Sequence, residues 1–186
     1  MSPEPILTLE PLIDAIRDGV ESNGWELSGL QKTTSHQFEG RWEGESTRSA
    51  YLFFHPPDGP EWVSVDVYLD ETSRGLTGNL ALVTDLLPLG ELESAEDLLD
   101  RLAALFAGHA EERYRRPVTL RFRAGDAGDD VDAAETEVRF KVRIPHAVIK
   151  DGGVAVRGMV GDVMRAFSAL LEESALRVRA AADETE

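Results

Sequence analysis

The amino-acid sequence predicts an α+β protein in which helices pack on one face of an antiparallel sheet. Apolar residues recur at helical spacing near both ends of the chain, and they alternate with polar residues over most of the stretch between. Short turns join the predicted strands, and such connections pair strands antiparallel because a parallel pair needs a long crossover. Segregated helices and strands of this kind form a two-layer sandwich.

The first element is an amphipathic helix over residues 8–22, with Thr8 as its N-cap, which ends at Asn23-Gly24. From residue 25 to residue 84 the hydrophobic period changes to two, including a strand around Phe38 and Trp42. Proline and glycine turn signals interrupt this stretch, as in PPDGP at residues 56–60. The pattern predicts a meander of four or five strands, paired in sequence order.

A second helix is predicted over residues 94–108, where Ser94 opens a stretch that resembles a capping box and Gly108 ends it. Two strands follow, around residues 118–122 and 138–144, and then a long final helix that includes Val160 to Leu171. We expect residues 152–153 to form a turn, and Gly158 and Gly161 to allow close helix packing. The element order is therefore α-β(4-5)-α-β-β-α.

Length and composition favour a single domain over residues 1–186, with an ordered core at about residues 8–178 and an acidic C-terminal tail. The start of the chain lacks the pattern of a signal peptide, and no apolar run is long enough to span a bilayer. We therefore expect a soluble cytoplasmic protein. The sequence has no cysteine, which excludes disulfides, a thiol nucleophile and cysteine-bound metals.

Charge is the most unusual property of the composition. The formal net charge is -16, and the basic residues are nearly all arginine, with lysine only at positions 32, 141 and 150. A surface of this charge repels nucleic acid and anionic membranes, so we expect neither as a partner. The composition looks like that of proteins from salt-accumulating microbes, and a halophile is the interpretation we favour over an acidic protein from a GC-rich genome.

The last two predicted strands place basic residues between their apolar ones. If the apolar residues face the core, the outward positions are Arg121, Arg123, Arg139, Lys141 and Arg143. Asp66 and Asp70 point outward on an earlier strand by the same argument, so a ladder of cross-strand ion pairs explains the pattern. The alternative is a basic strip for an acidic segment of a partner or of a second subunit. We favour pairing within the protein or its dimer.

Aromatic residues are the other candidates for a binding surface. The three tryptophans, with Tyr51, Phe53 and Tyr68, are the apolar residues that we expect to be functional. If Val63, Val65 and Val67 face the core, Trp62 and Tyr68 lie on the opposite face, where exposed aromatics often mark interfaces.

No residue set that carries chemistry emerges. The acidic loop at residues 126–137 resembles a calcium loop poorly, because Val131 stands where the turn glycine belongs. The four histidines are dispersed, and no nucleophile elbow or nucleotide-binding loop is present. We therefore predict no catalytic residue, no cofactor and no metal.

The element order resembles the type III secretion chaperone-like fold, which class I secretion chaperones share with the YbjN family of sensory-transduction regulators. The similarity is clearest in ALVTDLLPLGELESAEDLLDRLAALF and in EVRFKVRIPHAVIKDGGVAVRGMVGDVMRAFSALLEE. The family has three strands between its first two helices, whereas this chain has room for more. The resemblance implies a small acidic homodimer that binds another polypeptide without catalysis.

Two functions follow as expectations. The first is a noncatalytic protein-binding module, chaperone-like or regulatory, that acts as a homodimer on a partner whose identity the sequence does not reveal. The second is a helix-grip domain that binds a small molecule or lipid, either as a binding protein or as an enzyme, with a cavity between a curved sheet and the final helix. The two differ in whether that space is filled.

Overall fold

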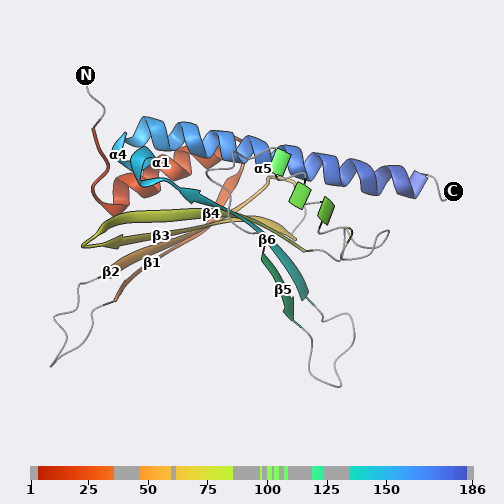
Figure 1. Ribbon diagram of the computed structural model, residues 1–186, viewed down its shortest axis with the longest axis horizontal. Helices are drawn as coiled ribbons and strands as arrows, with labels where there is room; N and C mark the ends of the chain where they lie inside the picture. Colours follow the sequence, from red (N-terminus) through yellow and green to blue (C-terminus); the bar gives the residue numbers. More distant parts are fainter. Residues whose placement is uncertain are drawn as a thin grey trace.

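The computed structural model describes residues 4–35, 47–59, 62–85, 119–123 and 135–183, and single positions of the segment between β4 and β5 (97, 100, 101, 103, 104, 107 and 108). Helices α1 (Leu9–Glu21), α4 (His146–Lys150) and α5 (Gly153–Asp183) lie on one face of an antiparallel sheet (Figure 1). This arrangement confirms the predicted α+β class. The single positions between 97 and 108 are helical, and the rest of the helix predicted there lies outside the described residues.

The sheet has six strands in the order β1-β2-β3-β4-β6-β5. They are β1 (Glu26–Ser35), β2 (Thr47–His55), β3 (Val63–Thr72), β4 (Gly75–Asp85), β5 (Thr119–Arg123) and β6 (Glu135–Ile144). Strands β1 to β4 form the predicted meander, with each strand paired to the next. The strand predicted around Phe38 and Trp42 lies outside the described residues.

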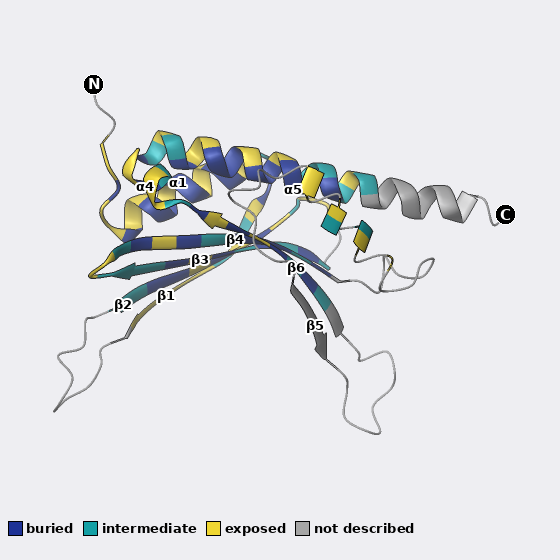
Figure 2. Ribbon diagram, in the orientation of Figure 1, coloured by how far each residue is buried: buried dark blue, intermediate teal, exposed yellow. Residues whose placement is uncertain are grey.

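The core lies between the sheet and helices α1 and α5, because every second residue of the central strands points that way (Figure 2). Phe54 on β2, Val65 on β3, Leu82 on β4 and Phe140 on β6 are each fully buried. A slip of one residue in any of these strands would expose its whole apolar set, so this alternation fixes the register of the sheet.

The two long helices touch at a glycine. A Cβ atom on Gly19 of α1 would lie 2.9 Å from the Val160 Cγ1 atom and 3.2 Å from the Arg157 carbonyl oxygen. The expectation that Gly158 and Gly161 provide the close contact is wrong: a Cβ on Gly158 would meet open space, and one on Gly161 only two side-chain nitrogens. The expected turn before α5 is present at Gly152, whose φ is +92°.

A residue distant in sequence caps the start of α1. Thr8 makes no side-chain hydrogen bond there, so the capping interaction expected of it is absent. The Leu9 N–H instead donates to the Glu71 carboxylate of β3 over 2.6 Å. Arg48 of β2 holds that carboxylate at 3.3 Å and also contacts Glu10, and its hydrogen bond lowers the pKa of the Glu10 carboxyl. The sheet thus positions α1 through an ionic cluster as well as through the core.

The ordered chain extends past both expected limits. Ile6 is buried in the core, and its N–H donates to the carbonyl oxygen of Ile149 over 3.3 Å. Helix α5 runs for 31 residues and ends at Asp183, beyond residue 178, where we expected the tail to begin.

Candidate functional site

The sheet face opposite the helices, which we call the open face, carries two rows of side chains that cross the strands. Directly paired residues share a face of a sheet, so the strand register defines each row. From β2 to β6 the first row is Phe53, Asp66, Ala81 and Lys141, and the second is Tyr51, Tyr68, Asn79 and Arg143. Each row begins with an aromatic residue and ends with a cation.

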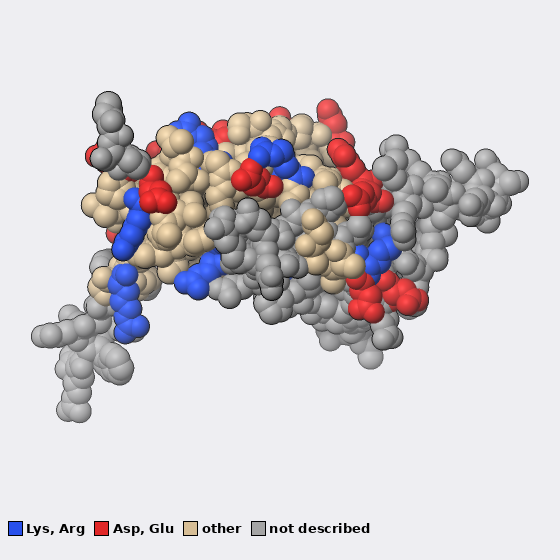
Figure 3. Space-filling model, turned by 45° about the horizontal axis from the view of Figure 1, so that its top comes forward, with Lys and Arg blue, Asp and Glu red and all other residues tan. Residues whose placement is uncertain are grey.

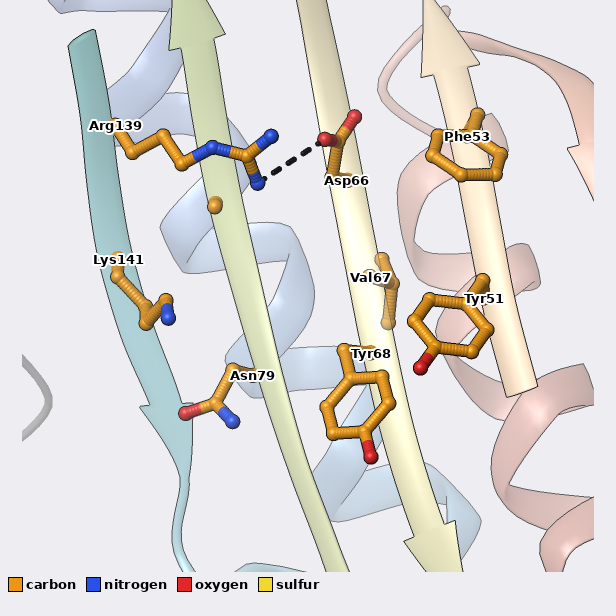
Figure 4. Close-up of a pocket in the computed structure, with 9 residues that line it drawn as sticks. Tyr51, Phe53, Asp66, Val67, Tyr68, Asn79, Arg139 and Lys141 are labelled. Atoms are coloured by element: carbon orange, nitrogen blue, oxygen red, sulfur yellow. Dashed lines mark ion pairs between the residues drawn. The ribbon is translucent and has the colours of Figure 1, made fainter. Parts of the chain in front are cut away.

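All residues of these rows except Arg143 line a hollow of about 410 Å³. Figure 4 shows its side chains standing on four neighbouring strands, with the aromatic rings on one side and the cations on the other. The lining residues are Tyr51, Phe53, Asp66, Val67, Tyr68, Asn79, Ala81, Arg139 and Lys141.

The aromatic side chains of the hollow are partly exposed, although two of the three rings pack against each other. Tyr51, Phe53 and Tyr68 are 36%, 37% and 36% exposed. The Tyr51 and Tyr68 rings lie with their centroids 4.8 Å apart, within the usual range for aromatic pairs. The Tyr68 hydroxyl donates to Asp70 over 2.7 Å; burial and this hydrogen bond raise the pKa of Tyr68 to about 12. Tyr68 is therefore a neutral phenol at physiological pH.

Arg139 belongs to an internal ion-pair network. Its guanidinium reaches across β4 to the Asp66 carboxylate at 3.3 Å, as the dashed line in Figure 4 marks, and it also contacts Glu137. Burial lowers the pKa of Arg139, but the hydrogen bond to Glu137 and the attraction of both carboxylates outweigh it and raise that pKa. One cation thus serves two anions, as the ladder interpretation predicted for this position.

Lys141 and Arg143 differ from Arg139. Both are exposed, and neither forms an ion pair among the described residues. The helix layer offers a contrast, because several of its basic groups lie beside acidic ones (Figure 3). Arg157 of α5, for example, lies 3.7 Å from Asp18 of α1. No acidic side chain in the described part of the chain therefore occupies the two cations at the end of the rows.

The other basic positions lie toward the edge of the sheet. Backbone pairing places Arg121 opposite Glu137 and Arg123 opposite Glu135. Oppositely charged residues in direct register favour sheet pairing by about 0.2–1 kcal/mol. The predicted strip is therefore divided: register sets Arg121 and Arg123 against acids, Arg139 is internally paired, and Lys141 and Arg143 are unpaired.

The two described tryptophans, Trp25 and Trp62, do not line the hollow. Trp62 precedes β3 and packs against the core, so the expectation that it shares the open face with Tyr68 is wrong. Strand alternation does not extend to it, because it belongs to a turn. Trp25 is a core residue at 5% exposure, and Trp42 lies outside the described residues.

Sequence reasoning did not name Asn79 or Ala81 as part of the site. Both lie on β4 between the aromatic and cationic sides of the hollow. The alternation of Leu80 and Leu82 with their neighbours was visible in the sequence. Since the two leucines face the core, Asn79 and Ala81 must point to the opposite face.

Among the described residues, no group of three or more His, Asp or Glu side chains is arranged to hold a metal ion. His55 contacts the Val63 carbonyl oxygen at 3.1 Å, and His146 lies at the start of α4. The acidic loop from residue 126, His36 and His109 lie outside the described residues. No helix in the described part of the chain is long and apolar enough to cross a membrane.

Comparison with known proteins finds no matching family model, curated protein or solved structure.

The Asp66 carboxyl gives the open face a pH dependence that can be measured. Burial raises the pKa of Asp66, and this effect outweighs the Ser64 hydrogen bond and Arg139, which lower it. The folded pKa therefore exceeds the unfolded value of about 3.9. Protonation favours the fold; this contribution is complete below the unfolded pKa and is lost as the pH rises through the folded pKa.

We therefore expect Asp66→Asn to raise the free energy of unfolding at pH 7, because the amide keeps the Ser64 contact and Arg139 keeps Glu137. Urea denaturation of both proteins between pH 3 and pH 7 measures the difference, which should shrink toward acid pH. A variant that is less stable than the wild type at pH 7 would show that the Arg139 ion pair outweighs the cost of burying the charge.

Proposed function

We propose that this protein is a noncatalytic protein-binding module, chaperone-like or regulatory, that takes a polypeptide partner on its open face. The observation that carries the proposal is that exposed aromatic rings and cations without an ion pair among the described residues lie on one face of the sheet. Exposed tyrosine and phenylalanine side chains are typical of interfaces, because they bury a large area when covered. Lys141 and Arg143 on the same face supply positive charges that no described carboxylate pairs with.

The homodimer and the cytoplasmic location are also part of this proposal. Their basis is the resemblance to the chaperone-like fold. Light scattering on the purified protein measures the assembly directly, and a mass of twice 20.4 kDa is the expected result.

The competing function, a helix-grip ligand domain, needs space between the sheet and the final helix. That layer contains Phe54 and Phe140 from the sheet and Phe167 from α5, each with no exposed surface. Side chains packed to this extent leave few voids larger than a water molecule. The described core therefore favours the protein-binding function over a ligand cavity at this position.

Affinity purification from the native host tests the proposal. The tagged wild type, the Phe53→Asp variant and the Val154→Asp variant are purified in salt matched to the host, and mass spectrometry identifies the proteins that co-elute. Val154 is the control because it is 77% exposed on the helix side. We expect one stoichiometric partner with the wild type and with Val154→Asp, and its loss with Phe53→Asp. A partner retained by Phe53→Asp, or no partner at all, would reject the proposal.

A further inference from the structure

We propose that the open face recognises an extended, acidic segment of its partner that carries an apolar side chain at one position and a carboxylate four residues later. This inference rests on the proposed function, and it specifies the chemistry of the partner. The inference rests on the spacing of the two rows, on the ion pairs of the cations and on the residues in the middle of the hollow.

The spacing follows from the strand order. From β2 to β6 the rows cross three strand intervals, β2 to β3, β3 to β4 and β4 to β6. Neighbouring strands lie about 4.8 Å apart, so the aromatic and cationic ends of a row are separated by about 14 Å. An extended chain rises about 3.3 Å per residue, and its side chains alternate between two sides. A segment that crosses the strands therefore places positions i and i+4 on the same side, about 13 Å apart.

The aromatic end requires an apolar residue. Phe53 and the Tyr51 and Tyr68 rings, which are tilted by 45° to each other, present exposed surface, and Ala81 lies beside them on β4. An apolar side chain at position i removes these rings from water. Hydrophobic stabilisation of about 25 cal/mol per Å² makes this end the source of much of the affinity.

The cationic end requires an anion. Lys141 closes the first row and Arg143 closes the second, and both lack an ion pair among the described residues. Arg139 is not available, because Asp66 and Glu137 already occupy it. A carboxylate at position i+4 meets Lys141 or Arg143 and forms a charge-assisted hydrogen bond.

The middle of the hollow excludes an acid at position i+2. That position lies over β3 and β4, where the first row carries Asp66 and the second carries the Tyr68 and Asn79 side chains. A carboxylate there would approach the Asp66 carboxylate, and like charges brought together in an interface oppose binding. The partner segment therefore carries an apolar residue at position i, an uncharged residue at position i+2 and an acidic residue at position i+4. Positions i+1 and i+3 accept any residue.

Selection from a displayed library of random nine-residue peptides tests this inference on the wild-type protein and on the Lys141→Glu, Arg143→Glu and Lys150→Glu variants. Lys150 is the matched control, because it is an exposed lysine on α4, away from the open face. We expect the wild type and Lys150→Glu to enrich an apolar residue and an acid at spacing i to i+4. The two open-face variants should lose the preference for the acid while keeping that for the apolar residue.

A synthetic peptide of the enriched pattern, labelled with fluorescein, then gives the magnitude. Replacing its glutamate by glutamine should weaken binding about tenfold, as the loss of one charge-assisted contact predicts. Moving the glutamate by one position should weaken binding similarly, because the carboxylate then points away from the sheet. Equal affinity of these peptides, no enrichment, or enrichment without an acid would overturn the inference.

The outcomes separate this inference from the proposed function. A native partner that is lost with Phe53→Asp but retained with both Lys141→Glu and Arg143→Glu would keep the protein-binding function and reject the acidic segment. A wild-type dimer that becomes monomeric with Phe53→Asp or Lys141→Glu would show that a second copy of the chain occupies the open face. That result too would overturn the inference.

Discussion

Replacing Phe54 by alanine should lower the free energy of unfolding by about 3–5 kcal/mol. Phe54 is fully buried between the sheet and the helices, so truncation removes apolar contacts and leaves a cavity that the surrounding core fills only in part. Its neighbour Phe53 lies on the opposite face of β2 and is 37% exposed. Phe53→Ala should cost less than about 1 kcal/mol, within the range of exposed substitutions.

Urea denaturation of the two variants and the wild type measures both values, and the m-value shows whether two-state unfolding is preserved. The pair is closely matched, because the same residue type is removed from adjacent positions of one strand. Equal losses of stability in the two variants would contradict the assignment of the core to one face of the sheet.

Arg139→Glu should lower the free energy of unfolding by about 2–3 kcal/mol. The substitution removes the cation that Asp66 and Glu137 share, and it places a third carboxylate beside them. All three groups are partly shielded from water, since the Arg139, Asp66 and Glu137 side chains are 25%, 20% and 33% exposed. Water and salt therefore screen the repulsion less than they would at an open surface.

Lys141→Glu is the matched control, two residues along the same strand and on the same face. It should change stability by less than about 0.5 kcal/mol, because the exposed ammonium pairs with no described residue. Thermal or urea denaturation at several salt concentrations compares the two. A similar cost for both variants would mean that the β6 cations act as one set, against the division into a paired and a free group.

Strand alternation placed most residues of the open face correctly, but it did not place every residue that we expected there. The buried leucines and valines of the meander placed Asp66, Tyr68, Arg139 and Lys141 on one face, and the structure brings them to one hollow. The same argument failed for Trp62, because the residue precedes β3 and its turn directs it to the core. A periodic pattern cannot reveal where a strand begins within one or two residues.

Contacts between elements distant in sequence were not predictable. The capping of α1 by Glu71 joins residues 62 positions apart, and no local pattern signals it. The close approach of α5 to Gly19 has the same origin, because the sequence contains both residues but does not show that Val160 lies against Gly19. The division of the basic strip depends on which strand lies beside which, and that order became known only with β6 placed next to β4.

The net charge of the chain also did not predict the local charge of the open face. A net charge of -16 predicted that nucleic acid is not a partner. It did not predict which basic residues pair with acids, since Arg48 and Arg157 have acidic neighbours whereas Lys141 and Arg143 have no ion pair among the described residues.

Site-specific photocrosslinking in the native host tests the central claim, that the open face holds the partner. A photoreactive phenylalanine analogue replaces Phe53 in one strain and Val154 in another, since both side chains are exposed, the first on the sheet and the second on α5. We predict a crosslink to a second polypeptide from position 53 and none from position 154. A crosslink from position 154 alone would place the partner on the helices and contradict the account.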